Sequence, residues 1–330
     1  MGCIMTHKRT TVILGAGAFG RALYTKICQA SPTVPHIWRR PHAHGEPESD
    51  IPYGYDLYEA LHNADTLIYA LPAQVFRSFW APLKTHLPPH IPLLITAKGL
   101  EQDTGFFFDD IMNDLALPNP LSILSGPHLA KELQNNGPTL GVISGSPEAT
   151  TLFQQRLTSP TFLLSTHTNM RAAMLANAFK NVLALLGGVI RGEGGCQNTL
   201  NSFLGLGFQE MRLFAHHEDV ADQDLLHPAL LGDFMLTTQS LDSRNTKMGM
   251  AIGRGDRHNT SFLSEGMTTL TGLLVRAQKT SVRLPVCQAL HTRIDGTSQN
   301  AEETRPLGSQ LGALAKILDE TSFNVQEKHL

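Results

Sequence analysis

The residue of this sequence best suited to proton transfer is a lysine within an apolar stretch. Residues 170–190 are mostly Ala, Leu, Val, Phe and Met, and the polar exceptions are Arg171, Asn177, Lys180 and Asn181. A helix that is apolar on nearly all sides is normally buried, and burial lowers the pKa of a lysine toward the range useful for a general acid or base. The polar residues also fit a narrow hydrated stripe along which Lys180 extends to solvent, so residue types alone leave both interpretations open.

A glycine-rich stretch near the N-terminus has the spacing of a phosphate-binding turn. Gly15, Gly17 and Gly20 stand between residues 11–14, which predict a short buried strand, and residues 21–30, which have helical apolar spacing. A G-x-G-x-x-G pattern needs this strand–turn–helix context to bind a dinucleotide. Gly15 would permit the tight turn, Gly17 would let a pyrophosphate approach the backbone, and Gly20 would let the helix pack closely on the strand.

The residues around this turn also indicate which dinucleotide binds. The backbone N–H groups of Ala18 and Phe19, at the expected start of the helix, favour a negatively charged phosphate. An acidic residue at the end of the second strand would favour the ribose 2′-hydroxyl of NAD(H), but Arg39 and Arg40 follow Trp38 there. Paired guanidinium hydrogen bonds suit a 2′-phosphate. We therefore favour NADP(H) over NAD(H), the alternative being that both arginines simply face solvent.

The elements that would position these residues differ between the two halves of the chain. The first half predicts strands at residues 11–14, 35–38, 66–71, 93–96, 122–125 and 140–144, which alternate with helical stretches. Such alternation predicts βαβ units and a mostly parallel sheet. From about residue 170 the pattern is helical, at residues 170–190, 199–216, 243–252 and 263–279. The fold class is therefore an α/β domain followed by an all-α domain.

Composition excludes several classes of protein. The 330 residues and 36.1 kDa suit two domains of ordinary size, and 42% hydrophobic with 17% charged residues argue against disorder. Lys and Arg total 26 against 29 Asp and Glu, without the basic excess of a general nucleic-acid binder. We find no apolar run long enough to cross a bilayer and expect no stable membrane insertion. The four scattered cysteines have no metal-ligand spacing, which indicates reduced thiols in a cytoplasm and no bound metal.

Short motifs occur along the chain in one order. They are GAGAFG at residues 15–20, TAKGLE at 96–101, SGPHLAKE at 125–132, FKNVLA at 179–184, LGDFMLT at 231–237, SRN at 243–245, SEG at 264–266 and LPV at 284–286. Over about residues 10–292 this series resembles the bacterial NAD(P)-dependent sn-glycerol-3-phosphate dehydrogenases. The motifs KGLE, KNV and SRN in this order are far more specific than the glycine turn.

The resemblance implies a fold and a reaction. The fold is a Rossmann-type domain, here residues 9–168, followed by a helical substrate and catalytic domain, residues 169–325, in a plan like that of 6-phosphogluconate dehydrogenase. The reaction is hydride transfer from NAD(P)H to C2 of dihydroxyacetone phosphate, which gives sn-glycerol 3-phosphate for glycerophospholipid synthesis. The substrate is thus a small molecule, and the family suggests a cytoplasmic homodimer.

The resemblance also implies roles for residues that match the family's motifs. Lys180 would protonate the new alkoxide, and Asp233 would orient Lys180 and the substrate hydroxyls. Implied substrate contacts are Lys98, Gly126, His128, Lys180, Asp233, Thr237, Ser243, Arg244 and Asn245. Cofactor contacts, with those derived above, are Gly15, Gly17, Ala18, Phe19, Gly20, Arg39, Arg40, Lys98, Ala130, Arg244, Leu263 and Glu265. His128 stands where the family usually has Ser or Thr, and residues 227–230 lack the family's glycines, which indicates a divergent member.

The sequence leaves two other functions open. A dehydrogenase for another phosphorylated ketone or for a hydroxyacid shares the two-domain plan, but the 3-hydroxyacid and ketopantoate types place an asparagine further along the lysine helix. Here Asn181 directly follows Lys180. A non-catalytic NAD(P)-binding sensor would retain the fold without the reaction. The charged residues with implied roles oppose that reading, and all are present: Lys98, Lys180, Asp233 and Arg244.

Overall fold

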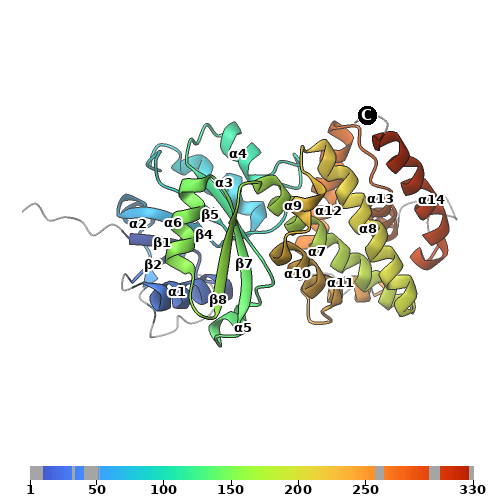
Figure 1. Ribbon diagram of the computed structural model, residues 1–330, viewed down its shortest axis with the longest axis horizontal. Coiled ribbons are helices and arrows are strands. Elements are labelled where there is room, and N and C mark those ends of the chain that lie inside the picture. Colours follow the sequence, from blue (N-terminus) through green and yellow to red (C-terminus); the bar gives the residue numbers. More distant parts are fainter. Residues whose placement is uncertain are drawn as a thin grey trace, which may run out of the picture. The chain divides into compact units, whose positions relative to one another are not determined.

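The chain forms two compact units, whose elements are labelled in Figure 1. A computed structural model describes residues 10–31, 34–40, 51, 53–256, 264–296 and 305–326, the last six by their backbone alone. The first unit comprises Met1–Ala97 and Phe108–Met170, and the second comprises Lys98–Phe107 and Arg171–Leu330. The sequence predicts two continuous domains with a boundary after residue 168. That boundary places the segment Lys98–Phe107 in the first domain, whereas the contacts group it with the second unit.

The first unit is built on one sheet. Its described strands are β1 (Thr10–Leu14), β2 (His36–Trp38), β3 (Tyr53–Gly54), β4 (Ala64–Tyr69), β5 (Leu93–Ile95), β6 (Leu121–Ser125), β7 (Thr139–Gly145) and β8 (Phe162–His167). They lie in the order β3-β2-β1-β4-β5-β6-β7-β8, and all neighbours run parallel except β6 and β7. The chain winds outward from β1 to β3 and then crosses to β4 on the other side of β1. Ligands of such sheets bind at the carboxyl ends of the strands, at this switch point.

Helices complete the first unit. They are α1 (Ala18–Ala30), α2 (Leu57–His62), α3 (Phe76–Trp80), α4 (Phe108–Asp114), α5 (Ala130–Gln134) and α6 (Pro147–Leu157). The core forms where buried strand residues such as Ile13, Ile68 and Leu94 cluster with Leu23 and Ile27 of α1. The predicted α/β domain with a mostly parallel sheet is therefore confirmed.

The second unit is helical in its described part. Its helices are α7 (Met170–Gly192), α8 (Gln197–His217), α9 (Asp222–Leu225), α10 (Pro228–Gln239), α11 (Arg244–Gly253), α12 (Glu265–Lys279), α13 (Pro285–Asp295) and α14 (Leu307–Gln326). Helices α8, α13 and α14 pack against one another toward the C-terminus (Figure 1). The predicted helical second half is confirmed.

Helix α7 corrects one expectation about membranes. By length and composition it could cross a bilayer, so the expectation that no apolar run is long enough is wrong. Every residue from Ala172 to Ile190 is buried inside the unit. Packing on all sides explains why this helix is apolar on all sides.

Two glutamates, of which Glu210 is buried, hold the first turns of later helices in this unit. Glu210 of α8 accepts hydrogen bonds from the backbone N–H groups of Val286, at 2.5 Å, and Cys287, at 3.0 Å, where α13 begins. Glu193 accepts one from the N–H of Leu307 at the start of α14, at 2.9 Å. The carboxylates thus satisfy N–H groups that have no partner within their own helix. Burial raises the pKa of Glu210 to about 7.

Candidate active site

The glycine turn of the first unit requires glycine at two of its positions. Gly15 has φ of +119°, and a Cβ there would lie 2.8 Å from the carbonyl oxygen of Ala70. A Cβ at Gly20 would overlap the carbonyl oxygen of Gly15. The N–H of Gly15 donates to the carbonyl of Trp38 at 3.1 Å, which ties the turn to the end of β2. The first and third glycines therefore let the strand, the turn and α1 pack closely.

The second glycine serves a different purpose. Gly17 is the N-cap of α1 with φ of −70°, a conformation open to any residue. A Cβ at Gly17 would meet nothing within 4 Å, so the space above it is open. The N–H groups of Ala18 and Phe19 begin the helix and have no partner within it. Open space beside such donors fits the pyrophosphate of a dinucleotide.

The two arginines lie at the same edge of the sheet as this turn. Strand β2 pairs in parallel with β1, with Trp38 opposite Leu14, so Arg39 and Arg40 follow β2 where Gly15 follows β1. The guanidinium of Arg39 lies 5.8 Å from the centre of the Tyr53 ring, and Arg40 is exposed. Both residues lie where a cofactor's ribose would follow the pyrophosphate.

His128 is turned into the first unit. Its side chain is buried, and its Nε2–H donates to the carbonyl oxygen of Leu140 at 3.0 Å. Its ring stacks on that of Phe19 in the glycine turn, with centroids 6.4 Å apart, and meets the Phe162 ring edge-on at 5.0 Å. A Cβ at Gly126 would lie 2.6 Å from Nε2 of His128, so this glycine makes room for the ring. His128, which the resemblance implies as a substrate contact, therefore uses one ring nitrogen in a hydrogen bond to the backbone of β7.

The second unit gathers three charged side chains from distant elements. Lys180 of α7 and Asp233 of α10 are only 2% and 3% exposed, and they form an ion pair. Lys98, the first residue of the segment Lys98–Phe107, approaches the same carboxylate oxygen, Oδ2, at 3.2 Å. The hydroxyl of Thr237 donates to the other oxygen, Oδ1, at 3.3 Å. Asp233 therefore holds two ammonium groups side by side.

Burial and the neighbouring charges shift the pKa values of the two lysines in opposite directions. Burial lowers the pKa of Lys180 to about 7; the charge of Asp233 opposes this shift, and that of Lys98 adds to it. Burial also disfavours the charged form of Lys98, but the attraction of Asp233 outweighs it and raises the pKa of Lys98. Lys180 is thus the group that can exchange a proton near neutral pH, while Lys98 stays charged.

The SRN and SEG motifs meet where α11 and α12 begin. Ser243 is the N-cap of α11, yet its side chain makes no capping hydrogen bond. The amide Oδ1 of Asn245 accepts from the N–H of Gly266 at 2.9 Å, which leaves its NH₂ group as the donor side. The largely exposed Arg244 lies 3.7 Å from Glu265. These donors at a helix start suit an anion, whereas Leu263 lies outside the described residues.

Close helix packing positions the SRN triplet relative to the lysine helix. Gly188 and Gly192 of α7 face Gly249 and Gly253 of α11, and a Cβ on any of the four would overlap backbone atoms of the other helix. The two backbones therefore touch. Larger residues would push the start of α11 away from α7.

Two polar side chains near this site have buried atoms that could hydrogen-bond a bound molecule. Nδ2 of Asn181 and Oγ of Ser264 are buried and have no hydrogen-bond partner among the described residues. Buried polar atoms are normally paired, which makes both atoms candidates for contact with a ligand. Asn181 lies beside Asn245, because a Cβ on Gly266 would contact both residues. The sequence signal for Asn181 is its polarity next to Lys180 in an apolar helix.

The chain matches protein-family models in both halves. The model of the NAD-dependent glycerol-3-phosphate dehydrogenase N-terminus matches residues 46–151, and that of its C-terminus matches residues 169–304. A protein of Ehrlichia canis (strain Jake) named as the NAD(P)+ form of glycerol-3-phosphate dehydrogenase is 30% identical over 305 residues, which are 84% of this chain and 94% of its own. A protein of the same name from Bradyrhizobium sp. (strain ORS 278) is 31% identical over 309 residues, which are 89% and 94% of the two chains.

A solved structure shares the fold. The crystal structure of glycerol-3-phosphate dehydrogenase from Coxiella burnetii has a TM-score of 0.79 to this chain, with 21% identity. The match covers 94% of this chain and 99% of that one.

In the part of the chain that the structure describes, no group of three or more His, Cys, Asp or Glu side chains could hold a metal ion.

Proposed function

We propose a function from the premise that this chain belongs to the NAD-dependent glycerol-3-phosphate dehydrogenase family. It is an NAD(P)-dependent oxidoreductase that acts on a CH–OH group, and its reaction is the reversible reduction of dihydroxyacetone phosphate to sn-glycerol 3-phosphate. One observation carries this proposal: the buried cluster in which Asp233 holds both Lys98 and Lys180. That arrangement suits a reaction which builds negative charge on one oxygen and then protonates it.

The roles of the three residues follow from their charges. Lys180 donates the proton to the C2 oxygen, because its lowered pKa makes the ammonium a ready acid near neutral pH. Lys98 stays charged and stabilises the developing alkoxide, and Asp233 fixes both ammonium groups. When bound, the nicotinamide supplies the hydride that C2 receives. In the reverse direction, neutral Lys180 takes the hydroxyl proton.

The start of α11 forms the handle for the substrate's phosphate. Ser243, Arg244 and Asn245 combine a hydroxyl that makes no capping bond, an exposed guanidinium and an oriented amide at a helix N-terminus. Binding energy from a phosphate remote from C2 can fix the geometry of the reacting atoms. Gly126, His128 and Thr237 complete the proposed substrate contacts.

The glycine turn holds the cofactor. Gly15 and Gly20 shape the backbone, and the open side of Gly17 with the N–H groups of Ala18 and Phe19 receives the pyrophosphate. Arg39 and Arg40 then favour the 2′-phosphate of NADP(H) over NAD(H). Further proposed cofactor contacts are Lys98, Ala130, Arg244, Leu263 and Glu265.

In the cell, the product would supply glycerophospholipid synthesis. We place the protein in the cytoplasm as a homodimer, following the family resemblance. We propose no nucleic-acid partner, since the chain has no basic excess. We also propose no membrane insertion, since α7 is buried by its own unit.

The test is oxidation of NADPH and of NADH with dihydroxyacetone phosphate, followed by absorbance. Lys180→Ala should lower kcat by roughly 10²–10⁴, the usual contribution of a positioned general acid, and should still bind NADPH. The control is Lys247→Ala, which removes an exposed lysine of the same unit and should keep full activity. A protein that binds NADPH but does not oxidise it with this ketone, or whose turnover survives Lys180→Ala, would overturn the proposal.

A further inference from the structure

The segment Lys98–Phe107, here called the lysine loop, is held by the second unit although the chain on both sides of it belongs to the first. Its first residue, Lys98, pairs with Asp233 in the candidate site. Its last residue, Phe107, is fully buried. The guanidinium groups of Arg171 and Arg276 lie 4.8 and 4.7 Å from the Phe107 ring centre. The loop is therefore fixed at the end opposite to Lys98.

The lysine loop is closed by its own hydrogen bonds. The N–H of Glu101 donates to the carbonyl of Phe106, and the N–H of Gly105 donates to the carbonyl of Glu101, both at 2.9 Å. The Thr104 hydroxyl donates to the Glu101 carboxylate at 2.5 Å and accepts from the N–H of Phe106 at 3.1 Å. These bonds close residues 101–106 into one turn that begins three residues after Lys98, so an anchor at Gly105 should also limit the position of Lys98.

One face of helix α12 provides that anchor. Gly272, Arg276 and Lys279 are four and three residues apart and so lie on one side of the helix. A Cβ at Gly272 would lie 2.8 Å from the Glu101 carbonyl oxygen, so helix and loop touch there. Arg276 Nη1 donates to the Gly105 carbonyl at 3.1 Å. Lys279, on the exposed end of this face, donates to a further loop carbonyl at 2.9 Å.

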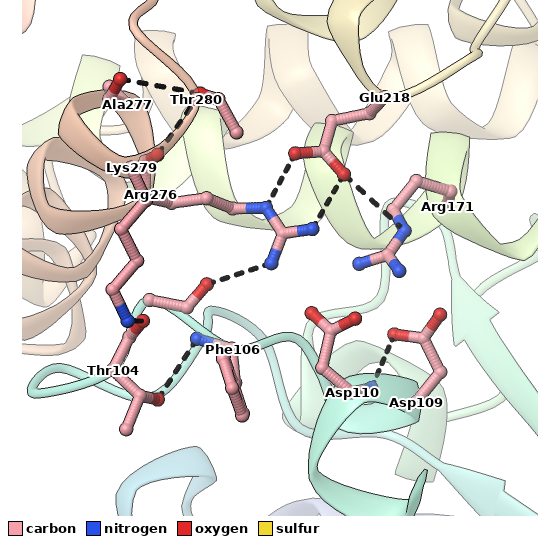
Figure 2. Close-up of polar contacts among 11 residues, drawn as sticks. Thr104, Phe106, Asp109, Asp110, Arg171, Glu218, Arg276, Ala277, Lys279 and Thr280 are labelled. Carbon is pink, nitrogen blue, oxygen red and sulfur yellow. Dashed lines mark hydrogen bonds and ion pairs between the residues drawn. The ribbon is translucent and has the colours of Figure 1, made fainter. Parts of the chain in front are cut away.

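Arg276 is itself held in a fixed orientation. Figure 2 shows its guanidinium between the Glu218 carboxylate and the lysine loop. Its Nε and Nη2 donate to the two oxygens of Glu218 at 2.5 and 2.7 Å, while Nη1 reaches the loop. The Glu218 side chain is 6% exposed, and Arg171 Nε lies 3.8 Å from it. Such a planar, two-pronged contact is specific to arginine, and lysine does not reproduce it.

We propose that Arg276 is a positioning residue for the reaction, because it anchors the lysine loop and thereby keeps the ammonium of Lys98 on Asp233. The inference rests on the proposed function, since it concerns the same site. Arg276 touches no reacting atom in this scheme and acts only through the loop. Its partner Glu218 and the ring of Phe107 act with it.

The anchor has a signature that simple loss of stability lacks. Lys180 faces the carboxylate of Asp233 and the ammonium of Lys98, and Lys98 also senses Glu265 at the start of α12. If the loop shifts, Lys98 moves away from Lys180 and its repulsion weakens. The protonated form of Lys180 then persists to higher pH, so the pH profile of reduction moves toward alkaline values.

The experiment compares Arg276→Ala, Arg276→Lys and Glu218→Gln with the wild-type enzyme. Arg276→Ala should lower kcat/KM for dihydroxyacetone phosphate on the order of ten- to a hundredfold, as misplaced catalytic groups do. Its pH profile should move to higher pH. Arg276→Lys should not restore the wild-type profile, and Glu218→Gln, which keeps the shape of the side chain, should show a smaller change in the same direction. Lys247→Ala, which removes an exposed lysine of the same unit that pairs with Asp242, is the control and should behave as wild type.

Hydrogen–deuterium exchange of the backbone amides of residues 101–106 in the full-length variants tests whether the loop is still held, independently of activity. Faster exchange there in Arg276→Ala, with slow exchange retained in α7, is the expected result. Unchanged exchange, or a uniform loss of kcat/KM with the pH profile in place, would overturn the inference. A wild-type protein that does not reduce dihydroxyacetone phosphate would instead overturn the proposed function, and the exchange result would still report on the loop.

Discussion

The glycine turn and the lysine–aspartate cluster are suited to holding charge in opposite ways. The turn is continuous in sequence, from Gly15 to Gly20, and uses backbone N–H groups and missing side chains. The cluster joins Lys180 and Lys98 to Asp233, across separations of 53 and 135 residues, and uses side chains, of which those of Lys180 and Asp233 are buried. A turn of this kind is complete once its local backbone has formed. A cluster of this kind exists only when distant helices have packed.

This difference predicts how each region responds to change. A substitution at Gly17, the open position of the turn, is local, because an added Cβ there would meet nothing within 4 Å. A fault in the cluster leaves a buried charge without its counter-charge, and the low-dielectric interior makes that costly. Substitutions in the two regions should therefore separate binding from folding.

Removing the shared carboxylate should have the largest effect. Asp233→Ala leaves two lysines facing each other, one of them buried, and should abolish activity and lower the unfolding free energy by up to about 3–5 kcal/mol, most at pH below 7, where Lys180 is protonated. Urea unfolding followed by circular dichroism would measure it. The control is Asp242→Ala, which removes an exposed carboxylate paired with Lys247 and should unfold as wild type does. Wild-type stability in Asp233→Ala would mean that the cluster does not couple folding to charge.

Alanine at two glycines of the turn should separate packing from binding. Gly20→Ala places a Cβ on the carbonyl oxygen of Gly15 and should cost about 1–3 kcal/mol of unfolding free energy. Gly17→Ala places its Cβ in open space and should leave the unfolding curve unchanged. Because that space is proposed for the pyrophosphate, the Kd of Gly17→Ala for NADPH should rise by roughly tenfold, about 1.4 kcal/mol. Calorimetric titration with NADPH would decide, and equal behaviour of the two variants would contradict the distinct roles of these glycines.

The arginines beside the turn should affect only one form of the cofactor. Arg39→Ala and Arg40→Ala each remove a donor to the proposed 2′-phosphate, and charge-assisted bonds of this kind contribute about 1.5–3 kcal/mol. The KM for NADPH should rise by roughly tenfold or more, while the KM for NADH stays close to its original value. Equal effects on both cofactors, or none, would mean that the arginines face solvent.

The fold is predictable from sequence where patterns are local. The strand at residues 11–14 and the helix at 21–30 lie within β1 and α1, because β-branched runs and helical spacing persist over enough residues. The pattern does not predict β3, which has two residues. Nor does it predict β8, an edge strand whose residues are partly exposed. Short and edge strands carry too few buried positions to show a period.

The site is predictable to a different depth in its two regions. The turn follows from residue types, whereas residue types leave the burial of Lys180 open, and the structure decides it. Asp233 is implied by the family resemblance alone, because no local pattern links residues so far apart. His128 turns toward Leu140 because the small residue Gly126 leaves room for its ring, which sequence spacing does not reveal. The grouping of the lysine loop with the helical unit is equally hidden, since the loop lies within the α/β part of the sequence.

The smallest expected effect is a change of the forward and reverse rates with pH. It depends on the lysine–aspartate cluster and not on the glycine turn. Burial lowers the pKa of Lys180 from an ordinary 10.5 to about 7, so about half of it is protonated at that pH. Reduction needs the protonated form and should slow as pH rises above about 7, while oxidation needs the neutral form and should quicken over the same range. Rates in both directions from about pH 6 to 9, with saturating substrates, would show this crossing. Gly17→Ala should leave its midpoint in place, because the turn carries no titrating group. A reduction rate that stays flat over this range would mean that Lys180 keeps the pKa of an exposed lysine, or that another group gives up the proton.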